Sequence, residues 1–247
     1  MSTEIVEIIE IIGRSEQGVT RPFICRGADD QVYFVKGRGA TRHGQICEWV
    51  AGQLALRLGL PVAPFRLVHV SEELLSIAMR DDVDDLGVGL AFGSCKLPVV
   101  ELSKSHLFHV PDDVQRDVLA FDWWVRNADR SLSDLGGNPN LFWDVEQEAL
   151  VVIDHNQAFD LTCTDDEFID VHAFWVQSNT LFHDWVMQQA YADRFMQVMA
   201  DWADICNTVP PEWLFVDDEQ TVPTDFDFDA VKRMLLRCRD NGFWSLR

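Results

Sequence analysis

Two short apolar runs in the middle of the chain predict a β-hairpin whose open end carries polar side chains. The runs are "NLFWD" at 140–144 and "ALVVID" at 149–154, and the polar turn "VEQE" separates them. A short turn joins antiparallel strands so that their outer ends lie together. We therefore expect Asn140 and Asp154, which occupy those ends, to face one point in space. An amide and a carboxylate beside an apolar core predict a binding site there.

A helix and a loop lead into this hairpin. Residues 111–128, "PDDVQRDVLAFDWWVRNA", have an acidic start and apolar residues at helical spacing, which is typical of a helix with one buried face. Asp129 follows in the loop, near the expected hairpin base. Mg²⁺ prefers hard oxygen ligands, and a carboxylate away from the metal can orient and deprotonate an acceptor hydroxyl. The pattern favours phosphoryl transfer, with Asn140 and Asp154 on the metal and Asp129 on the acceptor.

The first third of the chain is predicted to be β-rich, with one helix. Strand-like runs lie at 4–12, 21–27, 32–37, 62–70 and 74–80. Residues 45–59 have helical spacing and end at Gly59, with Pro61 beyond. The glycine-punctuated stretch 87–97 is interpreted as a connector between two lobes. Later amphipathic segments at 183–206 and 228–240 predict further helices, so we expect a small β-rich lobe at 1–97 and a larger, mainly helical lobe at 98–247.

The predicted small lobe offers groups that suit nucleotide phosphates. Lys36 ends the strand "VYFVK", and Glu48 lies on the next helix, where it could pair with the ammonium group. Gly13 and Gly18 bound the segment "GRSEQG", whose backbone amides could approach phosphates. Each of these features is weak by itself, and the ordered combination with the downstream set carries the prediction.

Composition excludes several other classes. The chain has 41 acidic and 20 basic residues, for a net charge of −21, which argues against nucleic-acid or anionic-membrane surfaces. None of the six cysteines forms a C-x-x-C pair, so neither a disulfide framework nor a zinc site is expected. His106 and His109 are interpreted as surface histidines, because no cysteine or carboxylate accompanies them. No apolar run is long enough to span a bilayer, and we expect a cytoplasmic protein without a membrane partner.

The order of Lys36, Glu48 and then "NADR…NPNLF…IDHNQAF" resembles the HipA-like kinases, particularly their short single-chain type. It is more remotely similar to the phosphatidylinositol 3- and 4-kinases and to protein kinases. The resemblance implies an α+β, bilobal protein-kinase-like fold that uses ATP and Mg²⁺. It also implies that Asp129 is the catalytic-loop aspartate with Arg130 as its companion, that Asn140 and Asp154 bind the metal, and that Lys36 binds phosphate.

Two departures from the family pattern bear on the ligands and the switch. The loop between Asp129 and Asn140 is longer than the compact superfamily form, so Asn138 competes with Asn140 as a metal ligand. His155 and Asn156 replace the Phe-Gly pair of protein kinases, so that activation switch is not assumed.

The resemblance further assigns a nucleotide-base site and a modification site. Residues 93–97, "GSCKL", take the place of the hinge that would hold adenine by backbone hydrogen bonds, which implicates Gly93, Ser94 and Cys95. Ser15 lies in the expected phosphate loop, where related kinases can be switched off by phosphorylation, and Thr20 is a rival target.

The function expected from these observations is ATP-dependent transfer of a phosphoryl group to a hydroxyl, on Ser or Thr of a protein. Toxin kinases of toxin–antitoxin pairs are among the relatives, which leaves open a toxin role with an antitoxin or other regulatory partner. Two alternatives stand beside it. One is a pseudokinase that binds nucleotide without transferring phosphate. The other is a small-molecule kinase of the aminoglycoside phosphotransferase type, although that family has an H-G-D loop where this chain has "NADR".

Overall fold

The structure is a computed structural model that describes residues 5–16, 18, 20–132, 137–240 and 242–246. The fold is of the mixed α+β class, as predicted. The chain divides into two compact units. Unit 1 holds the residues up to Trp49 together with Ala63–Pro98 and Thr208–Phe226, and unit 2 holds Val50–Val62, Val99–Asn207 and Asp227–Arg247.

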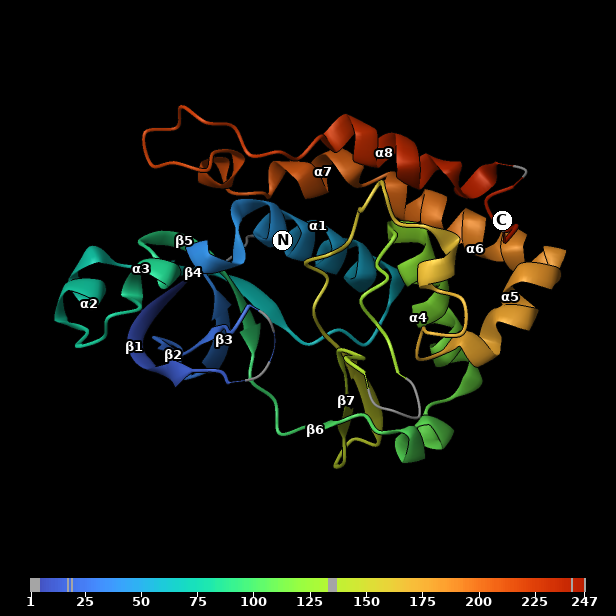
Figure 1. Ribbon diagram of the computed structural model, residues 1–247, viewed down its shortest axis with the longest axis horizontal. Coiled ribbons are helices and arrows are strands. Elements are labelled where there is room, and N and C mark those ends of the chain that lie inside the picture. The colour runs from blue at the N-terminus through green and yellow to red at the C-terminus, as the bar shows by residue number, and fades with distance from the viewer. Residues whose placement is uncertain (1–4, 17, 19, 133–136, 241, 247) are drawn as a thin grey trace. The chain divides into compact units, whose positions relative to one another are not determined.

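Unit 1 is built on a closed five-stranded barrel (Figure 1). Its strands are β1 (Val6–Arg14), β2 (Phe23–Gly27), β3 (Val32–Lys36), β4 (Phe65–Val70) and β5 (Gly89–Cys95). They pair in the order β1-β2-β3-β5-β4, and β4 closes the barrel by pairing with β1 in parallel at Val6–Val68 and Glu7–His69. This pairing closes the sheet at the start of β1, and closure reduces the unpaired strand edge that invites aggregation.

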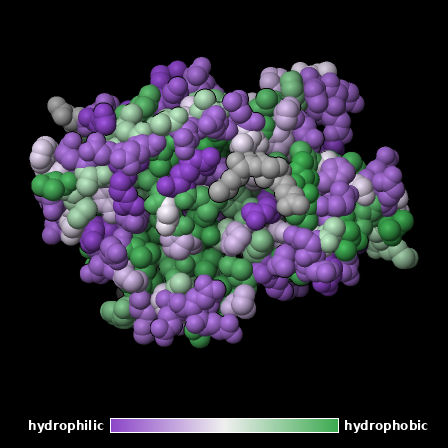
Figure 2. All heavy atoms as spheres, turned by 180° about the vertical axis from the view of Figure 1, so that it is seen from behind, coloured by the Kyte–Doolittle hydropathy of each residue, from purple (hydrophilic) through white to green (hydrophobic). Residues whose placement is uncertain are grey.

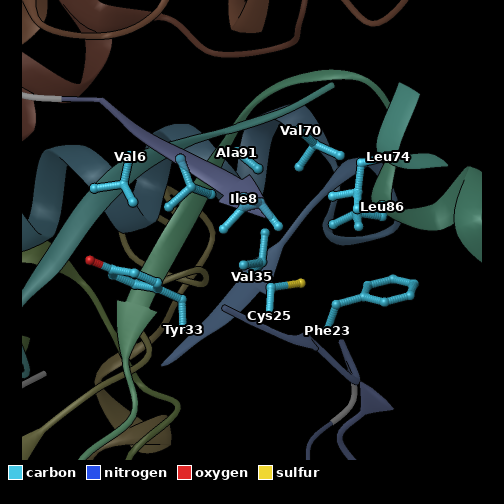
Figure 3. Packing of buried hydrophobic residues seen from close by; sticks show 11 residues of the cluster. Val6, Ile8, Phe23, Cys25, Tyr33, Val35, Val70, Leu74, Leu86 and Ala91 are labelled. Atoms are coloured by element: carbon cyan, nitrogen blue, oxygen red, sulfur yellow. The ribbon is translucent and has the colours of Figure 1, made fainter. Parts of the chain in front are cut away.

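The inward side chains of these strands form one apolar cluster (Figure 3). Val35 and Cys25 are fully buried there, and Ile8 is nearly so. Leu74 and Leu86 cover one end of the cluster, from α2 (Glu72–Ile77) and α3 (Val83–Leu86). Alternate residues of β2 and β3 are buried, as expected for strands with one face on a core.

The segment Thr208–Phe226 packs against the barrel although most of the chain separates them in sequence. Trp213, in the short 3-10 helix Pro211–Leu214, is fully buried and donates its indole N–H to the Leu90 carbonyl over 2.8 Å. Its ring meets that of Trp49 edge-on, with ring centroids 6.5 Å apart. Glu212 Oε1 accepts the Leu90 N–H over 2.7 Å. The sequence did not predict that this late segment completes the β-rich unit.

Unit 2 combines a small sheet with helices. The sheet order is β6 (Val100–Glu101), β7 (Leu141–Asp144) and β8 (Ala149–Val152), all antiparallel. The helices are α4 (Asp112–Val125), α5 (Ser178–His183), α6 (Trp185–Met199), α7 (Trp202–Asn207) and α8 (Phe228–Leu236). Aromatic rings fill the core around α4, and Trp124 stacks on Phe195 with centroids 4.3 Å apart. The helix α1 (Arg42–Leu58) joins the two units in sequence.

Most predicted elements are confirmed, and two predictions are wrong. The hairpin at 140–154 and the helix at 111–128 form as expected, as β7–β8 and α4. The run 74–80 is not a strand, because Ser71 caps α2 by accepting the Leu74 N–H and two glutamates fill its first turn. The stretch 87–97 is not simply a connector, since most of it is the strand β5.

The surface, the cysteines and the histidines show the following features. Hydrophilic residues are spread over much of the face drawn in Figure 2, with hydrophobic residues gathered between them. The six cysteines are all free thiols. In the part of the chain that the structure describes, no helix is both long and apolar enough to cross a membrane. Ser103 is the N-cap of the 3-10 helix Lys104–His109, and His106 Nδ1 accepts its N–H over 3.3 Å. No metal-binding cluster of His, Cys, Asp or Glu occurs among the described residues.

Candidate active site

The open end of the β7–β8 hairpin brings together the two predicted metal ligands. Leu141 pairs with Val152, and the Ile153 N–H donates to the Asn140 carbonyl over 3.1 Å. Asn140 is one member of this last pair, and Asp154 directly follows the other member, Ile153. Both Asn140 and Asp154 have left-handed backbones, with φ of 50° and 59°. Asn and Asp adopt this conformation more readily than other non-glycine residues. Their short polar side chains therefore serve the local turn as well as the site.

Asp129 lies against this hairpin end and is held by two amide groups. Asn140 Nδ2 donates to the Asp129 carbonyl over 2.9 Å and to Asp129 Oδ2 over 3.2 Å. Gln157 Nε2 donates to the same Oδ2 over 3.1 Å. The structure thus joins Asp129 and Asn140 as predicted from sequence, and it adds Gln157, which sequence reasoning missed.

The donor set fits a divalent cation. Because the Asn140 nitrogen faces two Asp129 oxygens, its amide oxygen is the atom that could ligate a metal. Asp154 contributes a half-buried carboxylate whose Oδ1 accepts the Asn156 N–H over 3.4 Å. One carboxylate and one amide oxygen are enough when phosphates and waters complete the shell, as is usual for Mg²⁺. Asn138 is exposed, and Asn140 is the asparagine that contacts Asp129, so the geometry favours Asn140 over its rival.

Arg130 is fully buried and points away from solvent. Its Nη1 donates to the carbonyls of Pro139, Asn140 and Ile153 over 3.2, 3.1 and 3.2 Å. Its Nε donates to Asp122 Oδ2 over 2.5 Å. The sequence prediction grouped Arg130 with the catalytic residues, and the structure places its guanidinium under the hairpin end, where it fixes backbone.

Asp122 in α4 stands at the centre of this buried group. Besides Arg130, it accepts from Asn127 Nδ2 over 2.9 Å and from His172 Nε2 over 3.0 Å. Burial alone would raise the pKa of the Asp122 carboxyl, but the Arg130 charge and the hydrogen bonds from His172 and Arg130 outweigh it and hold that pKa well below its usual range. Neither Asp122 nor His172 was predicted, because a helix aspartate and a distant histidine carry no motif.

Lys36 and Glu48 form a buried ion pair within unit 1. Lys36 ends β3, and Glu48 lies one turn or more into α1, as the sequence predicted. Gln45, also on α1 and fully buried, donates its side-chain amide to the Lys36 carbonyl over 2.6 Å. The strand end is thus tied to the helix through both its backbone and its side chain, which fixes the direction of the ammonium group.

The predicted phosphate loop begins later than expected. Gly13 lies within β1, where it pairs with Ile24, so it is a strand residue. The Ser15 N–H donates to the Pro22 carbonyl over 2.9 Å, directly after β1 ends and before β2 begins. Gly18 has φ of 79° and is exposed. Gln17, also part of the predicted loop, lies outside the described residues.

The predicted adenine hinge requires a correction. Gly93, Ser94 and Cys95 lie in β5, between β3 and β4 in the barrel. The N–H of Cys95 donates to Pro64 and that of Lys96 to Val32, each over 2.8 Å. The sheet therefore already uses the backbone groups assigned to adenine. Gly93 is small for packing, because a Cβ there would lie 2.6 Å from Val68 Cγ1.

A separate cavity of about 250 Å³ lies within unit 2. Its lining includes Trp123, Arg126, Asp160, Cys163, Arg237 and Phe243. None of the predicted site residues lines it. Its charged groups are engaged, since Arg126 Nη2 donates to the Cys163 carbonyl over 2.6 Å and to Asp165 Oδ1 over 3.3 Å. We therefore assign the site from the chemistry around Asp129 and not from this cavity.

Comparison with known proteins identifies the family of this chain. The sequence model of a family described as HipA-like kinase matches residues 8–247. No curated protein matches the chain. Among solved structures, the Helicobacter pylori proinflammatory kinase CtkA is similar, with 11% sequence identity and a TM-score of 0.45 over 96% of this chain and 95% of that one. The family match supports phosphotransfer of the kinase type, and it spans both units. The chain belongs to the HipA-like kinase family.

Proposed function

We propose that this chain is an ATP- and Mg²⁺-dependent kinase that transfers the γ-phosphoryl group to a Ser or Thr hydroxyl of a protein. The observation that carries the proposal is the contact of Asp129 with Asn140, at the hairpin end that also holds Asp154. A carboxylate next to two oxygen ligands is the arrangement that phosphoryl transfer needs, because catalysis there is mostly positioning and charge stabilisation.

Each residue then has a distinct role. Asn140 and Asp154 hold Mg²⁺, which when bound neutralises charge on the phosphates. Lys36, directed by Glu48, contacts the phosphates from β3. Asp129 orients the acceptor hydroxyl and takes its proton, while Asn140 and Gln157 keep its carboxylate in place.

The family supplies the finer parts of this proposal. A bilobal kinase layout, a protein acceptor, a cytoplasmic location and a regulatory or antitoxin partner are what the resemblance implies. The half-exposed Asp129 is compatible with a macromolecular acceptor. Phosphorylation of Ser15, at the start of the β1–β2 loop, would place nearly two negative charges in the expected phosphate site and oppose ATP binding.

Two aspartate variants test the proposal. Asp129→Asn should lower transfer from radiolabelled ATP by at least about 100-fold, since general bases contribute about 100- to 10,000-fold. Its Mg-ATP thermal shift should persist, because Asp129 is not a metal ligand. Asp154→Asn should instead shrink the thermal shift itself, because a metal carboxylate is lost. Asp204→Asn, an exposed change in α7, is the matched control for both.

The outcomes separate the alternatives. Wild-type protein that binds Mg-ATP and labels neither itself, a protein lysate nor small molecules is a pseudokinase. Labelling of small molecules alone would replace the protein acceptor in the proposal. Asp129→Asn as active as Asp204→Asn would remove Asp129 as the base.

A further inference from the structure

Two backbone segments, or arms, carry the candidate metal ligands Asn140 and Asp154, and the buried side chain of Arg130 binds both arms. Arg130 Nη1 donates to the carbonyls of Pro139 and Asn140 on one arm and of Ile153 on the other. The first arm ends in Asn140, and Ile153 immediately precedes Asp154. Both candidate ligands also have left-handed backbones, which surrounding contacts help to maintain. Arg130 is therefore placed to set the separation of the two ligands.

Asp122 in turn fixes the guanidinium of Arg130. It accepts from Nε over 2.5 Å and from Nη2 over 3.3 Å, and both side chains are fully buried. This two-pronged contact defines the plane of the guanidinium and hence the direction of Nη1. Rotation of the Asp122 side chain would move Arg130 Nη1, which donates to the carbonyls of both arms.

His172 completes the support from a segment that lies beyond the hairpin. The Phe174 N–H donates to His172 Nδ1 over 3.1 Å, so the ring proton resides on Nε2, which donates to Asp122 over 3.0 Å. Backbone bonds hold the same segment beside the catalytic loop, from the Leu132 N–H to Val171 and from the Ala173 N–H to Arg130. A neutral histidine with both nitrogens engaged is a rigid support and does not add a charge.

We propose that Asp122 and His172 are positioning residues for phosphotransfer, which set the separation of Asn140 and Asp154 through Arg130. The inference rests on the proposed function of the same site. It assigns a catalytic consequence to residues 160–173, the segment after the hairpin, because displacement of His172 would loosen the metal ligands without touching them. Outer-shell groups of this kind typically change metal affinity by about 10- to 100-fold.

The alternative interpretation is that Asp122, Arg130 and His172 only satisfy one another's hydrogen-bonding groups in the core. A buried ion pair is weak evidence for stability, because the cost of removing both charges from water offsets their attraction. The two interpretations differ in where they expect the hydrogen bonds of the network to end. A core-filling network has no reason to end on carbonyls beside both candidate ligands, whereas a positioning network does.

The test measures metal binding separately from transfer. Mn²⁺ replaces Mg²⁺ as the probe, and electron paramagnetic resonance gives its dissociation constant in the presence of ADP, below the melting temperature of every variant. His172→Ala should raise this constant by about 10-fold or more. His172→Gln retains an N–H donor for Asp122 and should restore most of the affinity. Leu181→Ala, a fully buried change in α5, lowers stability without removing a hydrogen bond of the network and should leave the constant unchanged.

Several outcomes would overturn the inference. An Mn²⁺ constant for His172→Ala equal to that of Leu181→Ala means that His172 is merely structural. Failure of His172→Gln to recover affinity, while it remains folded, removes the hydrogen bond to Asp122 as the cause. Arg130→Lys, which keeps charge but loses the forked geometry, must also weaken Mn²⁺ binding. If wild type binds Mn²⁺ with ADP but transfers no phosphate, the kinase proposal is refuted, and the comparison of Mn²⁺ binding among the variants still decides the present inference. If wild type binds no Mn²⁺, the kinase proposal and the present inference are both overturned.

Discussion

The side-chain amide of Gln157 donates to Asp129 Oδ2 over 3.1 Å, although 28 residues separate the two in sequence. Asn140 reaches the same oxygen over 3.2 Å from the opposite arm of the hairpin. Two amides therefore orient one carboxylate, while the carboxylate itself stays half-exposed. A general base needs this combination, because it must be directed at the acceptor and yet be reachable by it.

Removal of the Gln157 amide should slow transfer moderately. Gln157→Ala deletes one exposed hydrogen bond to a charged group, and we expect kcat to fall about 3- to 10-fold, because solvent weakens such a bond to roughly 1 kcal/mol. The KM for ATP should not change, since Gln157 does not contact the expected ligands of the nucleotide. Steady-state kinetics check this, with the exposed Gln147→Ala in the β7–β8 turn as control. Equal kcat values for the two variants would show that Asp129 needs no such help.

The Lys36–Glu48 pair should show a difference between stability and binding. Lys36→Met leaves the Glu48 carboxylate buried without its ammonium partner, which should lower the free energy of unfolding by about 3–5 kcal/mol. The double variant Lys36→Met, Glu48→Met removes both charges and should recover most of that loss. Neither variant should show the full ATP-dependent thermal shift, because the expected contact of the Lys36 ammonium group with the phosphates is absent from both.

Urea unfolding and thermal shifts check these two effects. The exposed pair Arg26–Glu10, 2.8 Å apart, provides the control, and its double methionine variant should change the unfolding free energy by less than about 1 kcal/mol. A full thermal shift in Lys36→Met would place the phosphates elsewhere. A double variant no more stable than Lys36→Met would mean that the pair's burial does not cause the loss.

Local patterns were enough to predict the hairpin and its polar ends. The turn "VEQE" and the apolar runs beside it fix the pairing of β7 with β8, and pairing fixes the meeting of Asn140 with the residues before Asp154. The strand end at Lys36 and the helix position of Glu48 followed in the same way, because each depends on residues close in sequence. These parts of the site needed no knowledge of long-range contacts.

Several contacts that the sequence did not predict are long-range. Closure of the barrel depends on parallel pairing of β1 with β4, and Trp213 fills unit 1 from a segment near the end of the chain. Gln157 lies within the quoted stretch "IDHNQAF" but was given no role there, and His172 lies in no motif. Only the folded chain brings them to Asp129 and Asp122. Gly93 was assigned to an adenine hinge within a predicted connector. In the structure its small size is explained by the neighbouring Val68 side chain, which sequence spacing cannot show.

Trp213 should matter as much to stability as any barrel residue. It is fully buried, so Trp213→Ala should lower the free energy of unfolding by about 3–5 kcal/mol through lost contacts and the cavity left behind. The matched control is Trp185→Ala at the start of α6, where the side chain is 69% exposed and the loss should stay near 0.5 kcal/mol. Chemical denaturation of both variants gives the comparison. Similar losses would mean that Thr208–Phe226 is not an integral part of unit 1.

His172 should make stability depend on pH. Burial lowers the pKa of His172 more than its hydrogen bond and charge interaction with Asp122 raise it, so the folded chain holds this ring neutral. The unfolded chain protonates it near the ordinary histidine pKa of about 6.5. Below that pH the unfolded state binds more protons, and the free energy of unfolding should fall by up to about 1.4 kcal/mol per pH unit from this group.

The variant His172→Gln isolates that contribution. Because glutamine does not titrate, the difference in unfolding free energy between wild type and variant should narrow steadily as the pH falls from 7.5 to 5. The pKa of Asp122 is also depressed in the folded chain. Asp122 therefore adds its own loss of unfolding free energy only at lower pH, at and below the ordinary aspartate range. Urea unfolding at several pH values measures the effect, with the exposed His183→Gln as control. A difference that widens as the pH falls would mean that His172 is protonated in the folded chain, and its support of Asp122 would then be a charge interaction. A constant difference would mean that the pKa of His172 is the same in the folded and unfolded chains.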